Sequence, residues 1–357
     1  MKKLLALILT GTLAMSVLSA CGSTAVVAVP PPQESTPAAT EPVLENPQEM
    51  SGEPVKTGFY LSASVSGSKS AADGEDGIGQ ADIDLVAVTV TDAGVIDSCV
   101  IDSIQSKVTF DAAGAITADL AAAVPTKNEL GSDYGMGKYS PIGKEWNEQA
   151  QALADYVVGK TLEEIQGIAV TEEGKAADAD LAASVTVSIA GYLDAIQQAV
   201  ANATHLGAKQ GDRLVITTST NIAGSKDAAA DADGLAQTYA TVGAVTLNGE
   251  TVTSCYIDAV QANVNFDLSG AITTDLTAPV SSKNQLGDDY GMRKASSIGK
   301  EWNEQAAAFS AYVTGKTLDE VAGIAVNEKG AAADADLAAS VTLSLGEFQT
   351  LIAKIGA

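Results

Sequence analysis

Two identical stretches of eleven residues carry the side chains best placed to do chemistry. Ala-Ala-Asp-Ala-Asp-Leu-Ala-Ala-Ser-Val-Thr occupies residues 176–186 and again residues 332–342. Both copies run into alternating apolar residues, a pattern that predicts a strand with Ser184, Thr186 and Ser188 on one face. A row of hydroxyl groups beside small alanines leaves room for a bulky group to approach. We therefore take this repeated stretch as the candidate functional feature.

The composition excludes several classes of function. The chain has 357 residues, with 20 basic against 45 acidic residues and a net charge of −25. Such an acidic surface repels nucleic acid and anionic lipid headgroups, so neither is an expected partner. His205 is the only histidine, which argues against histidine-based metal sites and Ser-His-Asp catalysis. No pattern marks a substrate pocket, so we expect neither a metal site nor catalytic residues.

The first 56 residues are typical of a targeting signal and a tether. Lys2 and Lys3 precede an apolar run, residues 4–17, that is too short to span a membrane. Leu-Ser-Ala-Cys at residues 18–21 resembles a bacterial lipobox, which implies a signal peptide over 1–20 and lipidation of Cys21; the alternative is a plain secretory peptide. Residues 21–56 are rich in Pro, Ser and Thr and are expected to form a disordered tether. The mature protein is then expected on the extracytoplasmic face of the cell membrane, held by lipid alone.

The remainder reads as two copies of one domain, 57–202 and 211–357, offset by 156 residues. A period this long indicates whole domains rather than solenoid repeats, and we expect each to fold independently of the other. Cys99 and Cys255 occupy equivalent positions and are expected to be buried and unbridged. In the first copy the patterns predict a hairpin, a long helix capped by Ser140, a second helix that begins with a capping box, and a terminal helix, over residues 83–104, 142–157, 161–164 and 190–201. The long helix carries one apolar stripe from Ile142 to Val157. In the second copy a hairpin turn is predicted at Asn248-Gly249 and a capping box at Thr317. The order of elements predicts an α+β fold, a mainly antiparallel sheet packed with helices.

The repeated stretch also resembles a known family. Asp178-x-x-x-Ala182-Ala183-Ser184 is similar to the Asp-x-x-Ser/Thr-Gly-Ala-Thr motif of FMN-binding domains, such as the C subunit of the sodium-pumping NADH:quinone reductase. In that family an ApbE-type flavin transferase joins the phosphate of FMN to the last Ser or Thr through a phosphodiester. The lipobox, the tether and two copies of Leu-Gly-x-Asp-Tyr-Gly-Met and Ile-Gly-Lys-Glu-Trp resemble flavinylated lipoproteins of the PplA type, which serve extracellular electron transfer.

The resemblance implies two tandem FMN-binding-type domains with one covalent FMN each, but it leaves the attachment residue open. Leu181 stands where the family has Ser or Thr, and Ala182 stands where it has Gly. Small residues precede Ser184, whereas bulky Val185 precedes Thr186, so Ser184 is favoured. The residues implied to hold FMN are Ser184 and Ser340 (attachment), Thr186 and Thr342 (alternative attachment), Asp178 and Asp334, Ala183 and Ala339, and Tyr134, Met136, Tyr290 and Met292 against the isoalloxazine ring.

On this resemblance the protein is an electron carrier rather than an enzyme. Electrons would come from a membrane quinone or flavin oxidoreductase and pass to soluble flavins or metal acceptors. Two other functions remain open at this stage, a solute-binding lipoprotein of a transporter and a cell-surface structural repeat protein. In both of these the repeated stretch would be an alanine-rich edge strand without a cofactor.

Overall fold

The computed structural model describes residues 52–356. The predicted signal peptide, Cys21 and the tether up to residue 51 lie outside the described residues. Among the described residues, no helix is both long enough and apolar enough to cross a membrane.

The fold is α+β, as predicted, and contains two three-stranded antiparallel sheets with the strand orders β1-β2-β3 and β4-β5-β6. The strands are β1 (Lys56–Ser64), β2 (Gly77–Val90), β3 (Ile96–Phe110), β4 (Arg213–Asn221), β5 (Gly234–Asn248) and β6 (Thr251–Phe266). The predicted hairpin around residues 92–94 is confirmed, although its strands extend further than the apolar alternation indicated. The Asn248-Gly249 turn is also confirmed, and Gly249 has the positive φ of +58° that such a turn requires.

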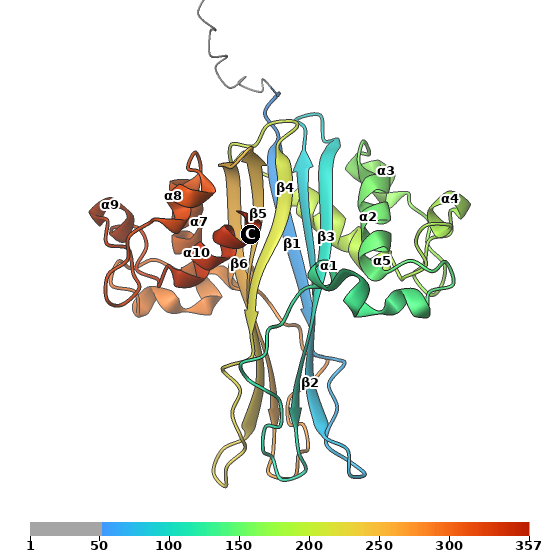
Figure 1. The fold of residues 1–357 in the computed structure, drawn as a ribbon, viewed down its shortest axis with the longest axis vertical. Coiled ribbons are helices and arrows are strands. Elements are labelled where there is room, and N and C mark those ends of the chain that lie inside the picture. The colour runs from blue at the N-terminus through green and yellow to red at the C-terminus, as the bar shows by residue number, and fades with distance from the viewer. Residues whose placement is uncertain (1–51, 357) are drawn as a thin grey trace, which may run out of the picture. The chain divides into compact units, whose positions relative to one another are not determined.

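The two copies repeat one order of helices, and Figure 1 shows the helices flanking the paired sheets on both sides. The α-helices are α1 (Lys127–Leu130), α2 (Trp146–Val157), α3 (Leu162–Gln166), α4 (Ala179–Ala182) and α5 (Ala190–Ala201), then α6 (Lys283–Leu286), α7 (Trp302–Val313), α8 (Leu318–Ala322), α9 (Ala335–Ala338) and α10 (Gly346–Ala353). Short 3₁₀ turns are η1 (Gly131–Tyr134), η2 (Met136–Lys138), η3 (Gly287–Tyr290), η4 (Met292–Lys294) and η5 (Lys354–Gly356). The predicted capping boxes at Thr161 and Thr317 both form.

Helix α2 begins four residues later than predicted. Ser140 does not cap it; Glu145 does, in a capping box with Glu148. Gly143 has a φ of +68°, a left-handed conformation that interrupts any helix before it. The predicted apolar stripe is confirmed from Trp146 onward, since the residues at its successive turns, Trp146, Ala150, Leu153 and Val157, are buried.

The two sheets pack against each other, and both contribute to the same inner core. One inner cluster joins Phe59, Leu61 and Ile83 of the first sheet to Val242 and Val260 of the second. At the far end of the sheets Phe110 and Phe266 stack with ring centroids 3.9 Å apart and an interplanar angle of 1°. The expectation that each half folds independently does not match this packing, because separating the halves would expose apolar faces of both sheets.

Hydrogen bonds also cross between the halves. The Thr57 and Ser254 hydroxyls lie 2.7 Å apart, and Thr238 Oγ1 donates to Ser106 Oγ at 2.8 Å. Ala71 N donates to Gly270 O at 2.9 Å, and Ala228 N donates to Gly114 O at 2.8 Å. The last two bonds join corresponding turns in opposite directions, so the two halves meet through the same surface on each.

The helices cover the outer face of each sheet and form a separate core there. In the first half this outer cluster joins strands β2 and β3 to Trp146, Leu153, Leu181 and Ile196. The corresponding residues build the outer cluster of the second half. Cys99 and Cys255 are buried in these clusters and form no disulfide with each other, as predicted, and burial raises the pKa of each thiol to about 12.

Candidate functional site

The repeated stretch forms a helical turn, and the predicted strand is wrong. Asp178 Oδ1 accepts hydrogen bonds from the backbone N–H of Asp180 at 3.1 Å and of Leu181 at 3.0 Å, and so caps the four-residue helix α4. The Ser184 and Val185 amides then donate to Leu181 O at 2.9 and 2.8 Å, which extends the turn. Leu181, Val185 and Ile189 are the buried residues here. Their spacing of four residues suits a helical turn packed on a core and not a strand with a period of two.

The fourth residue of the turn, counted from the capping aspartate, is a buried leucine in both halves. Leu181 and its counterpart Leu337 are 3% and 2% exposed and belong to the outer cores. They anchor the turn by apolar burial, which a serine or threonine would not do. Asp334 caps α9 as Asp178 caps α4, through a bond from Leu337 N at 2.9 Å.

The candidate attachment residues lie in different surroundings. Ser184 and Ser340 are half-buried, and each follows an exposed alanine, Ala183 or Ala339. Among residues 52–356, no hydrogen bond forms from the hydroxyl group of Ser184, and the same holds for Ser340. An accessible hydroxyl without an intramolecular partner is free to react, so the favoured attachment residues remain chemically suitable.

Thr186 is bound to a buried glutamine that the sequence analysis missed. Gln149 of α2 is fully buried, and its Oε1 accepts from Thr186 N at 2.8 Å, Thr186 Oγ1 at 3.1 Å and Val187 N at 3.2 Å. Its Nε2 donates to Ser140 Oγ at 3.2 Å and Lys144 O at 3.1 Å. One side chain thus fixes the segment after the repeated stretch to the loop before α2.

The second half repeats this connection. Gln305 Oε1 accepts from Thr342 N at 2.8 Å and Thr342 Oγ1 at 3.1 Å. Its Nε2 donates to Ser296 Oγ and Lys300 O, both at 3.2 Å. The signal was present in the sequence, because Gln149 and Gln305 lie in identical segments, 142–150 and 298–306. A polar residue repeated beside an apolar helical stripe indicates a buried hydrogen-bond partner.

A lysine packs over aromatic rings beside this connection. Lys127 Nζ lies 5.0 Å from the centroid of the Trp146 ring and 5.3 Å from that of Tyr134. Tyr134 and Met136 are half-buried against the outer core. Trp146 is one helical turn before Gln149, so the lysine, the Tyr-Gly-Met loop and the Thr186 segment converge on the first turn of α2.

In the second half Lys283 is 6% exposed and contacts three rings. Its Nζ lies 4.8 Å from the Tyr239 centroid and 4.9 Å from those of Tyr290 and Trp302, and it donates to Tyr239 Oη at 3.0 Å. Burial lowers the pKa of Lys283 to about 8, although the charges of Glu347 and Asp258 oppose that shift. Met292 is half-buried beside these rings.

A buried aspartate holds each lysine-bearing helix in place. Asp102 Oδ1 accepts from Ser103 N at 2.7 Å and from Asn128 N at 3.1 Å, at the start of α1. Asp258 Oδ1 does the same for Ala259 N at 2.7 Å and Asn284 N at 3.0 Å. Burial raises the pKa of both carboxyls to about 6, because it outweighs these hydrogen bonds. The sequence analysis did not single out these residues, although an aspartate inside an apolar strand is an unusual feature.

The structure therefore brings together part of the predicted set. The Thr186 segment and the loop that follows Met136 meet through α2, which contacts both α4 and η1. Asp178 is exposed and lines a cavity of about 450 Å³ together with Tyr156 and Lys160. No hydrogen bond joins Ser184 to Tyr134 among the described residues, and no group of three or more metal-ligating side chains occurs within 52–356.

Comparison of the chain with known protein families, with curated proteins and with solved structures finds no match.

Proposed function

We propose that the protein is a membrane-anchored extracellular electron carrier that holds one covalent FMN in each half. The observation that carries the proposal is the accessible serine hydroxyl of Ser184 and of Ser340, each on a turn fixed by an aspartate cap and a buried leucine. A phosphodiester requires a hydroxyl that a flavin transferase can reach, and small residues beside it. Ala182 and Ala183 meet the second requirement.

The surrounding residues fit a flavin in charge and in shape. Lys127 and Lys283 place an ammonium group over the tryptophan in the first turn of α2 and of α7, in a chain whose net charge is −25, and a positive charge stabilises the phosphate and the reduced ring. Tyr134 and Tyr290 offer aromatic faces on glycine-flanked loops. When bound, FMN supplies the electron-transfer chemistry, and these residues supply its position and electrostatics.

The proposed partners follow from this role. An ApbE-type transferase would form the phosphodiester, a membrane quinone or flavin oxidoreductase would supply electrons, and soluble flavins or metals would accept them. The antiparallel sheets favour this function over a solute-binding lipoprotein, for which interleaved parallel α/β lobes are expected.

Intact-mass measurement after production with the transferase tests the proposal. We expect each half to gain about the mass of one FMN less one water, and Ser184→Ala with Ser340→Ala to lose both additions. Thr186→Ala with Thr342→Ala is the matched control, since it changes the other hydroxyl of each half. If only the threonine pair abolishes the additions, the attachment residues are Thr186 and Thr342. A chain that gains no flavin at all contradicts the proposal.

A further inference from the structure

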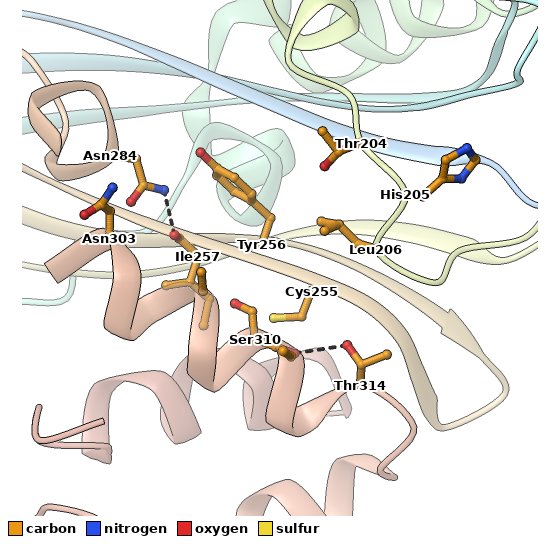
Figure 2. A pocket seen from close by; sticks show the side chains of 12 residues that line it. Thr204, His205, Leu206, Cys255, Tyr256, Ile257, Asn284, Asn303, Ser310 and Thr314 are labelled. Atoms are coloured by element: carbon orange, nitrogen blue, oxygen red, sulfur yellow. Dashed lines mark hydrogen bonds between the residues drawn. The ribbon is translucent and has the colours of Figure 1, made fainter. Parts of the chain in front are cut away.

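The second half contains a cavity that the proposed flavin attachment does not use. It has a volume of about 590 Å³ and lies between α7, the edge strand β6 and the segment 204–206 that links the two halves (Figure 2). This volume is within the range of roughly 300–1,000 Å³ that is typical of small-molecule sites. One face of α7, with the C-cap residue Thr314 that follows it, lines the cavity on one side; the residues of the helix are Asn303, Ala307, Ser310 and Ala311.

Three polar atoms at this cavity have no hydrogen-bond partner among the described residues. They are Ser310 Oγ, Asn303 Oδ1 and Asn284 Oδ1, and all three are buried. Ser310 as a whole is only 5% exposed. Asn284 Nδ2 donates to Ile257 O at 2.9 Å, which fixes the amide so that Oδ1 is the atom left over (Figure 2). A buried polar group without a partner is destabilising, so three at one cavity indicate a site that a bound molecule completes.

The lining is almost free of charge, although the chain is strongly acidic. The histidine in this lining is His205, and its Nε2 lies 2.9 Å from Asp92 Oδ1. Burial raises the pKa of Cys255 to about 12 and also raises that of Tyr256, so both side chains stay neutral at physiological pH. Ile257 and Leu206 complete an apolar wall. A neutral site of this kind favours an uncharged ligand, because a charge would be desolvated without a counter-charge.

The corresponding place in the first half is different. There, Gln151 and Asp155 stand where the second half has Ala307 and Ala311, and Gln151 Nε2 donates to Asp155 Oδ1 at 2.8 Å. The cavity at that place, about 540 Å³, is lined by Lys144, Glu148 and Asp155. The two alanines therefore make the second-half cavity neutral, and the pair from the first half supplies a substitution that this fold already accommodates.

We propose that the second-half cavity binds an uncharged ring compound whose N–H and O–H groups donate to Asn284, Asn303 and Ser310. The ring contacts Tyr256 and the aliphatic wall, and its donors satisfy the three buried polar atoms. The site is separate from the Ser340 turn, and the inference does not rest on covalent attachment of FMN.

Riboflavin and FMN form a matched pair of probes, because they share one ring and differ by the charged phosphate. The full chain is produced without a flavin transferase and titrated into each compound while the quenching of flavin fluorescence is followed. We expect saturable binding of one riboflavin and at least tenfold weaker binding of FMN. If riboflavin shows no saturable binding, water alone fills the cavity and the proposal is overturned. Equal affinity for riboflavin and FMN overturns it as well.

Variants locate the binding. Ala307→Gln with Ala311→Asp should weaken riboflavin binding at least tenfold, whereas Gln151→Ala with Asp155→Ala in the first half should leave it unchanged. Circular dichroism checks that both variants fold. Ser184→Ala with Ser340→Ala should also leave riboflavin binding unchanged, so loss of covalent FMN and loss of this site are separate results. Binding that survives the Ala307→Gln and Ala311→Asp changes contradicts the assignment.

Discussion

In each half a lysine lies over the corresponding tryptophan, Trp146 or Trp302, but the surroundings of the two lysines differ. Lys127 is half-buried and contacts two rings, whereas Lys283 is almost fully buried and contacts three. The third ring belongs to Tyr239, and the equivalent residue in the first half is Asp82, because Asp82 pairs with Gln105 as Tyr239 pairs with Gln261. One residue on a sheet strand thus changes how far a charge is removed from water, while the lysine, the tryptophan and the loop remain the same.

Other differences between the halves surround the same site. In the first half Tyr192 Oη donates to Asp84 Oδ1 at 3.0 Å; the second half has Phe348 and Thr241 at these positions. If both halves hold flavin, these differences give the two flavins different electrostatic surroundings on one scaffold.

The loops that carry Tyr134 and Tyr290 differ as well. In the second half Arg293 bonds Gly299 O at 3.1 Å and pairs with Glu304 at 2.9 Å, and Glu301 accepts from Met292 N at 2.8 Å. The first half has Gly137 in place of Arg293. The arginine ties the second loop to the start of α7, so we expect the first loop to be the more mobile of the two.

Cutting the chain between the halves tests whether they form one body, and of the changes considered it has the largest expected effect. Cleavage at a protease site inserted after Lys209 should leave both fragments together, because Phe110, Phe266 and two inner clusters are shared. Size-exclusion chromatography with mass analysis should find one species that contains both fragments. Each half produced alone should aggregate or pair with itself. Two fragments that elute as separate folded monomers would contradict the shared core.

The buried glutamines should show a smaller and unequal effect. Gln149→Leu leaves three donors without an acceptor and should lower the free energy of unfolding by about 3 kcal/mol; Gln305→Leu leaves two and should lower it by about 2 kcal/mol. Urea unfolding measures both values, and loss of flavin should be confined to the changed half. Gln151→Leu, on the exposed side of α2, is the control and should change stability by less than about 0.5 kcal/mol. Equal losses of unfolding free energy for Gln149→Leu and Gln305→Leu would contradict the expected difference between the two halves.

The smallest effect is a shift in a titration. Because the pKa of Lys283 is lowered to about 8, its charge should be lost as the pH rises through 8. The unfolded chain keeps that proton up to a pH of about 10.4, so stability should rise between these two values. In Trp146→Phe, which leaves Trp302 as the only tryptophan, the emission should change with a midpoint near pH 8.

Two further variants sharpen this measurement. Tyr239→Ala removes the third ring and admits water to the lysine, so the midpoint should move upward toward the ordinary lysine value. Lys283→Met should abolish the transition. A midpoint that Tyr239→Ala leaves in place would show that the third ring does not control the burial of the charge.

Structural features that depend only on neighbouring residues could be predicted from the sequence. The hairpin turns, the capping boxes at Thr161 and Thr317, and the apolar stripe from Trp146 to Val157 follow from local preferences, and the structure contains them. The error at residues 184–189 has the same origin. Alternation predicted a strand there, but Asp178 caps a turn and Leu181 is held by the core, and these contacts outweigh a weak local preference.

The shared core of the two halves and the residues around each lysine are visible only in the tertiary structure. Tyr239, Lys283 and Trp302 are far apart in the sequence and meet because β5, α6 and α7 pack on one face of a sheet. The role of Gln149 depends in the same way on a segment 37 residues further along the chain. Periodicity shows which face of an element is apolar, but which side chain lies opposite a given residue depends on how two faces pack together, and that is a property of the folded chain as a whole.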